Sequence, residues 1–200
     1  MEDYLKDIQD IKKMMDKSSQ FLSLSGLSGI LAGIYALAGA YAAKLIYDAN
    51  YGKYITFESN SFKLIVLIAL AVLALSLLTA FALTLKKARK QGDTMWNSTT
   101  KRLVVNFLIP LGTGGIFAVL LIKNQYYGLI APIMLIFYGL ACVNASKYTL
   151  RDVRYLGITM VIIGLLATWF MGYGLEFWAL GFGVCHIIYG SLMYYKYDRK

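Results

Sequence analysis

The stretch that decides the fold is residues 64–85, which read LIVLIALAVLALSLLTAFALTL and contain no charged residue. An α-helix needs about 20 such residues to cross the roughly 30 Å hydrocarbon core of a bilayer. The whole chain agrees with this stretch: 58% of its 200 residues are hydrophobic and 16% are charged, and the mean hydropathy is +0.58. Soluble domains have about 45–50% apolar and about 25% charged residues. The sequence therefore predicts an all-α polytopic membrane protein.

Five further apolar runs lie on either side of this stretch, and each is long enough to cross a membrane. The six predicted spans are residues 21–43, 64–85, 103–122, 128–145, 155–171 and 174–194. Together they predict one transmembrane domain over residues 21–195, folded as a six-helix bundle. A polar segment, residues 1–20, precedes this domain, and a short tail, residues 196–200, follows it.

Positive charges are distributed unevenly between the loops. All but four of the 20 Lys and Arg residues lie in the N-terminal segment, the second loop, the fourth loop and the tail. The other four are Lys44, Lys53, Lys63 and Lys123. Because Lys and Arg gather in cytoplasmic loops, both termini are predicted to be cytoplasmic. The net charge of +9 follows from this pattern and does not indicate nucleic-acid binding.

Two surfaces are candidates for helix packing or for contacts between copies of the chain. Residues 3–17 carry an apolar stripe at helical spacing, which predicts a cytoplasmic amphipathic helix on the membrane surface, on the bundle or on a partner. The first span carries two ladders of small residues: Ser25, Gly29 and Gly33, and Ser28, Ala32, Ala36 and Ala40. Small residues let helix backbones approach closely in lipid. We expect the first span to pack within the bundle, with a homo-oligomer as the alternative.

Few residues could carry enzyme chemistry. Cys142 and Cys185 lie in apolar runs and are expected to be small buried side chains, not a disulfide. A single histidine cannot supply the paired axial ligands of a transmembrane haem. The carboxylates are not clustered as a hydrolytic metal site requires. The sequence therefore predicts no enzyme, no cofactor and no metal site.

The single histidine, His186, lies near the middle of the sixth span. Ionisable residues inside a bilayer are costly, and they are therefore candidates for a functional role. Glu176, Gly183 and His186 are separated by seven and three residues, which places them on one helical face. Glu176 is expected at the outer mouth, and Gly183 is expected to leave a groove beside the imidazole.

The third span offers a counterpart to this face. Asn106, Pro110 and Thr113 share one side of the helix, and Pro110 lacks the N–H that would bond a carbonyl one turn earlier. Broken helices near the midplane recur in transporter sites. We expect a midplane binding site between spans three and six, with Thr113 and His186 at similar depth. The alternative is a packing kink beside a hydrogen-bonded core histidine.

Two segments of the chain are similar to each other. Residues 136–139 read IFYG and residues 187–190 read IIYG, and Lys-Tyr follows each of them at residues 147–148 and 196–197. The similarity indicates a duplicated helical hairpin, formed by spans three and four and by spans five and six. The alternative is that Gly in turns and Tyr at interfaces recur without duplication.

The chain also resembles a known family in three segments: SLSGLSG at 23–29, NASKYTL at 144–150 and GFGVCHIIYG at 181–190. These segments resemble an uncharacterised family of small six-span membrane proteins of Bacteroidota. The resemblance implies a bacterial cytoplasmic (inner) membrane and assigns no site residue. Two classes of function stay open. One is a non-catalytic scaffold, sensor or subunit of a membrane assembly, and the other is a small-molecule or ion transporter or channel that acts as an oligomer.

Overall fold

The computed structural model describes residues 21, 24–50, 58–91 and 96–199. These residues include six helices that are long and apolar enough to cross a membrane, and they form no β-strand. The predicted all-α class and the six spans are thereby confirmed. The predicted helix over residues 3–17 lies outside the described residues.

Five spans are each built on one α-helix, and the sixth changes its helical geometry along its length. The five are α2 (Gly26–Ala49), α3 (Asn60–Gln91), α4 (Ser98–Lys123), α5 (Ile130–Ala145) and α6 (Asp152–Trp169). The sixth consists of α7 (Gly174–Trp178), the π-helical segment η3 (Ala179–Cys185), α8 (His186–Met193) and the π-helical segment η4 (Tyr194–Asp198). Short 3₁₀ turns, η1 (Tyr127–Leu129) and η2 (Ser146–Tyr148), flank α5.

The ends of the first two spans differ from the prediction. Helix α2 begins at Gly26 and not at residue 21, because the backbone of Phe21 pairs with the loop between α5 and α6. The amide of Phe21 donates to the carbonyl of Tyr148 at 2.7 Å, and the hydroxyl of Thr149 donates to the carbonyl of Phe21 at 2.7 Å. Helix α3 has 32 residues, about 48 Å at 1.5 Å per residue. Its basic end continues the helix beyond the hydrocarbon core.

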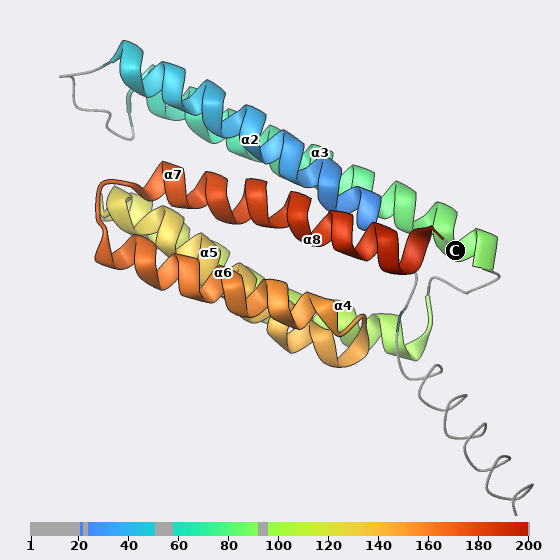
Figure 1. Ribbon diagram of the computed structural model, residues 1–200. Helices are drawn as coiled ribbons and strands as arrows, with labels where there is room; N and C mark the ends of the chain where they lie inside the picture. The colour runs from blue at the N-terminus through green and yellow to red at the C-terminus, as the bar shows by residue number, and fades with distance from the viewer. Residues whose placement is uncertain (1–20, 22–23, 51–57, 92–95, 200) are drawn as a thin grey trace, which may run out of the picture.

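The helices are arranged in layers (Figure 1). Helix α3 packs against α2, and the opposite side of α2 packs against the sixth span. The sixth span in turn contacts α5 and α6, which form the most extensive helix pair in the described part of the chain. Helix α4 packs against α5. The sixth span therefore lies between the α2–α3 pair and the other three helices.

The most enclosed side chains lie where α5, α6 and the sixth span meet. Leu135 of α5 and Met160 of α6 are fully buried, and Cys185 packs in the same cluster. Cys142 and Cys185 are both buried and free, as the sequence predicts. This cluster fixes the position of the sixth span, which carries His186.

Glycines bring α2 and the sixth span into close contact. A Cβ atom added at Gly190 would lie 2.5 Å from the backbone nitrogen of Ile30, and one added at Gly33 would lie 2.6 Å from the carbonyl oxygen of Gly183. Real Cβ atoms do not approach backbone atoms this closely, so only glycine fits at these positions. Ser28, Ala36 and Ala40 of the small-residue ladders are buried as well. The small-residue faces of the first span are thus used for packing within one chain.

A partly buried carboxylate joins three helices at the N-terminal end of α2. Asp198 accepts hydrogen bonds from the amide of Gly26 at 2.8 Å and from the ammonium of Lys87 at 2.6 Å. Lys87 also donates to the carbonyl of Leu24 at 2.8 Å. Ser25, which precedes α2, makes no capping bond with its own side chain. Asp198 therefore supplies the N-terminal cap of α2 from the far end of the sixth span.

Candidate functional site

His186 is buried and hydrogen-bonded through both ring nitrogens. Its Nδ1 lies 3.0 Å from the carbonyl oxygen of Gly181, and its Nε2 lies 2.7 Å from the hydroxyl oxygen of Tyr138 on α5. A carbonyl can only accept, so Nδ1 carries a proton. In the neutral imidazole, Nε2 then accepts the hydrogen of the Tyr138 hydroxyl. The polar atoms form one chain from Tyr138 through His186 to Gly181.

Aromatic rings surround the hydrogen bonds of His186. The ring of Phe182 stacks on the imidazole of His186 at a centroid distance of 5.9 Å and an interplanar angle of 22°. Tyr138 lies 5.1 Å from Phe182 and 6.0 Å from Phe107 of α4, measured between ring centroids. Apolar rings enclose the imidazole, and protein atoms bond both of its nitrogens. Its hydrogen bond with Tyr138 connects α5 to the sixth span.

The sixth span is π-helical over Ala179–Cys185, directly before His186. π-helical turns are rare, and those that do occur often lie at functional sites. Here the segment carries Gly181, whose carbonyl the imidazole bonds, and Gly183, which faces α2. The predicted groove beside the imidazole is absent at Gly183, because Leu37 of α2 fills this space. A Cβ atom added at Gly183 would lie 2.7 Å from Cγ of Leu37.

The predicted face of the third span does not meet His186. Thr113 is exposed, and its hydroxyl donates to the carbonyl of Ile109 in its own helix at 2.8 Å. Helix α4 packs against α5, and the ring of Tyr138 lies between Phe107 and His186. The prediction of a site between spans three and six is therefore corrected: its residues lie on helices that α5 keeps apart. Helical spacing identified a shared face on each span but could not identify which spans are neighbours.

Pro110 frees a carbonyl as predicted, and a neighbouring helix satisfies it. Pro110 lies inside α4 and has no N–H to offer the carbonyl of Asn106. The side-chain amide of Asn144 on α5 donates to this carbonyl at 2.9 Å. The side chain of Asn106 donates to the carbonyl of Arg102 at 2.8 Å. The Pro110 region is thus a packing element between α4 and α5.

Glu176 lies near the start of the sixth span and makes a weak contact there. Its carboxylate lies 3.5 Å from the ammonium of Lys44, and both side chains are about half exposed. Exposed ion pairs contribute about 0–1 kcal/mol. The pair links α2 to α7 without adding much stability.

A second polar cluster, which the sequence did not predict, lies at the end of the sixth span. The ammonium of Lys196 lies 2.9 Å and 3.2 Å from the two carboxylate oxygens of Asp152, and the hydroxyl of Tyr197 donates to the same carboxylate at 2.7 Å. The sequence does not indicate this contact, because Asp152 lies on α6 and the other two residues lie on the sixth span.

No protein-family model, curated protein sequence or solved structure matches the chain. Within the described residues, no three His, Cys, Asp or Glu side chains are grouped so that they could hold a metal ion. The site is a hydrogen-bonded aromatic cluster that joins α4, α5 and the sixth span.

Proposed function

We propose that the protein is a non-catalytic integral membrane protein that acts as a scaffold, sensor or subunit of a membrane assembly. The observation that supports this role is the position of α3 at the edge of the bundle (Figure 1). Helix α3 packs against α2, where the hydroxyls of Tyr35 and Thr79 lie 3.4 Å apart. Large apolar side chains cover its other sides and are exposed: Leu67, Leu70, Leu73, Leu77, Leu78 and Phe81.

The deep polar groups favour the same role. His186, Tyr138 and Asn144 have hydrogen-bond partners inside the protein, and these bonds hold helices together. The open side of α3 is long enough to contact a partner helix across the whole bilayer. The alternative function, transport by an oligomer, stays a prediction.

The mass of the complex in mild detergent tests the scaffold role. Combining Leu70→Ala with Leu77→Ala should release α3 from a partner, because the two exposed side chains lie seven residues apart on one face. Ile162→Ala with Leu165→Ala on α6 is the matched control, since these side chains are exposed to a similar extent. We expect a lower mass for the α3 variant alone. An unchanged mass for that variant, or a wild-type protein that is a monomer, would contradict the proposal.

We also propose that both termini face the cytoplasm of a bacterial cell. The distribution of Lys and Arg supports this orientation. Green fluorescent protein fused after residue 200 is expected to fluoresce, and alkaline phosphatase fused there is expected to be inactive. Alkaline phosphatase fused between α4 and α5 should be active. The reverse pattern at either position would contradict this topology.

A further inference from the structure

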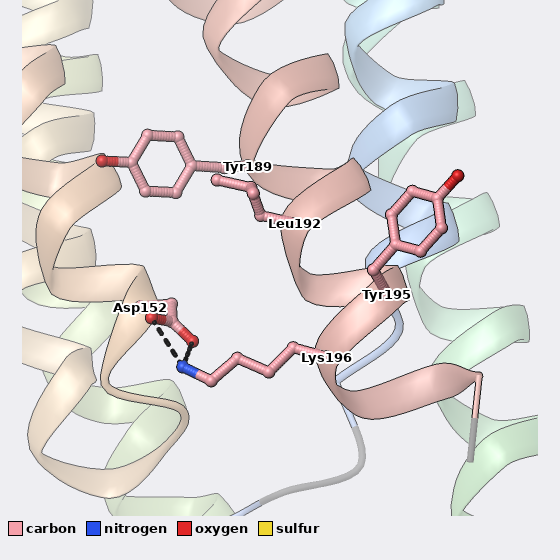
Figure 2. Close-up of a pocket in the computed structure, with 5 residues that line it drawn as sticks. All are labelled: Asp152, Tyr189, Leu192, Tyr195 and Lys196. Atoms are coloured by element: carbon pink, nitrogen blue, oxygen red, sulfur yellow. Dashed lines mark hydrogen bonds and ion pairs between the residues drawn. The ribbon is translucent and has the colours of Figure 1, made fainter.

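A crevice opens between the start of α6 and the end of the sixth span. Its volume is about 420 Å³, within the range of roughly 300–1,000 Å³ typical of small-molecule sites. Figure 2 shows the side chains that line it: Asp152, Tyr189, Leu192, Tyr195 and Lys196. Four of the five come from the sixth span, and Asp152 comes from α6.

Two polar contacts frame the crevice along the helix axes. The ammonium of Lys196 contacts the carboxylate of Asp152 at 2.9 Å, and the hydroxyls of Tyr189 and Thr159 lie 3.5 Å apart. The partners on each helix are seven residues apart, which corresponds to about 10 Å along a helix. Both contacts use a long side chain from the sixth span, and these side chains keep the two helices apart.

In the other half of the sixth span, a side chain of α6 packs directly against a glycine. A Cβ atom added at Gly181 would lie 3.2 Å from Cε of Met160 on α6. The crevice thus lies where the sixth span contacts α6 through the long side chains of Tyr189 and Lys196 and not through a glycine. It lies at the end of the bundle where Lys87 and Asp198 also meet.

The lining changes from apolar to cationic towards this end. Leu192 is 59% exposed and Tyr195 is 64% exposed, so their apolar surfaces are open to the bilayer. The guanidinium of Arg199 lies over the ring of Tyr195, 5.5 Å from its centroid. The side chain of Lys196 is 58% exposed despite its contact with Asp152. Arg151, beside Asp152 in sequence, is exposed as well. With Lys87, four cations at this end of the bundle outnumber the two carboxylates, Asp152 and Asp198.

We propose that this crevice binds an anionic phospholipid. Its phosphate contacts Lys196 at the mouth of the crevice, and an acyl chain lies against Leu192 and the ring of Tyr189. The charge pattern favours an anion, since basic groups at a membrane surface attract anionic lipids. The apolar lining favours a lipid over a small soluble anion, because an acyl chain covers surface that inorganic phosphate would leave exposed.

The carboxylate of Asp152 competes with the lipid phosphate for Lys196. Two substitutions should therefore have opposite effects. Lys196→Gln removes the cation and should weaken lipid binding by about fivefold, the factor expected for one basic residue at a membrane surface. Asp152→Asn releases the ammonium and should strengthen binding. A purely structural role for this ion pair would not predict tighter lipid binding in either variant.

The test uses the full-length chain, purified in a neutral detergent and depleted of lipid. Dioleoyl phosphatidylglycerol is titrated, and bound lipid is counted by native mass spectrometry beside the shift in melting temperature. Phosphatidylcholine and inorganic phosphate are the comparison probes, and Lys101→Gln, an exposed lysine at the start of α4, is the matched control. We expect selective binding of phosphatidylglycerol that Lys196→Gln weakens and Lys101→Gln leaves unchanged.

Leu192→Trp gives an independent test, because it fills the crevice without changing any charge. We expect it to abolish selective lipid binding while the protein stays folded. Retained binding in this variant would overturn the proposal. Equal binding of phosphatidylcholine, a full effect from inorganic phosphate alone, or equal losses in Lys196→Gln and Lys101→Gln would also overturn it.

Discussion

Gly190→Leu should separate α2 from the sixth span and cause a large loss of stability. The Cβ atom of the new side chain would lie 2.5 Å from the nitrogen of Ile30 and 2.8 Å from the carbonyl oxygen of Gly26. Both are backbone atoms of α2, so relief requires movement of the whole helix. Overpacked sites cost about 1–3 kcal/mol, and sometimes more. We expect this site to lie at or above the upper end of that range, measured as a lower melting temperature in detergent.

Gly115→Leu on α4 is the matched control for this experiment. It makes the same change within a membrane-spanning helix, and no atom lies within 4 Å of its added Cβ. We expect its melting temperature to stay close to that of the unmodified protein. Equal losses in the two variants would show that glycine itself, and not the α2 contact, matters at Gly190.

Asn144→Leu should destabilise the pairing of α4 with α5. It removes the amide that donates to the carbonyl of Asn106, which Pro110 leaves without a partner in its own helix. Backbone polar groups in the hydrocarbon core must be satisfied by the protein. Hydrogen bonds between membrane helices contribute about 0.6–2 kcal/mol, and we expect a loss of that size in the free energy of unfolding.

A second substitution identifies the cause of this loss. Pro110→Ala restores an N–H that can bond the carbonyl of Asn106 within α4. In that background, Asn144→Leu should cost clearly less than it does alone, so a double-mutant cycle should give a non-zero coupling energy. The same cost in both backgrounds would mean that Asn144 contributes through packing and not through this carbonyl.

The number and class of the spans were predictable because the cost of exposing polar groups to lipid restricts which sequences can cross a membrane. The start of α2 was not predictable from hydropathy. Phe21 is apolar enough to belong to the first span, but its backbone bonds Tyr148 and Thr149 in a distant loop. Such a contact depends on the tertiary arrangement, which the pattern of apolar residues does not contain.

The candidate site was predictable in part. His186 and Pro110 were predictable as notable residues: the imidazole of His186 is buried, and Pro110 leaves the carbonyl of Asn106 without a partner in its own helix. The sequence could not identify Tyr138 and Asn144 as their partners, because both lie on α5, between the two predicted faces. Of the alternative stated from sequence, the structure shows the hydrogen-bonded core histidine, whereas Pro110 lies on α4, which packs against α5.

The duplicated hairpin stays a prediction, and the structure adds detail to it. The tyrosines of the two similar segments both make contacts through their hydroxyls, Tyr138 with His186 and Tyr189 with Thr159. The glycines that follow them both lie at close helix crossings, Gly139 against α6 and Gly190 against α2. Similar residues thus occupy similar packing positions against different helices.

The cap that Asp198 places on α2 has a consequence for biosynthesis. Gly26 is synthesised long before Asp198. Helices α2 and α3 are therefore made before the carboxylate that accepts the hydrogen bond of the Gly26 amide. During that interval Lys87 also lacks its carboxylate partner. A nascent chain stalled before Asp198 would therefore lack the carboxylate that caps α2 and pairs with Lys87.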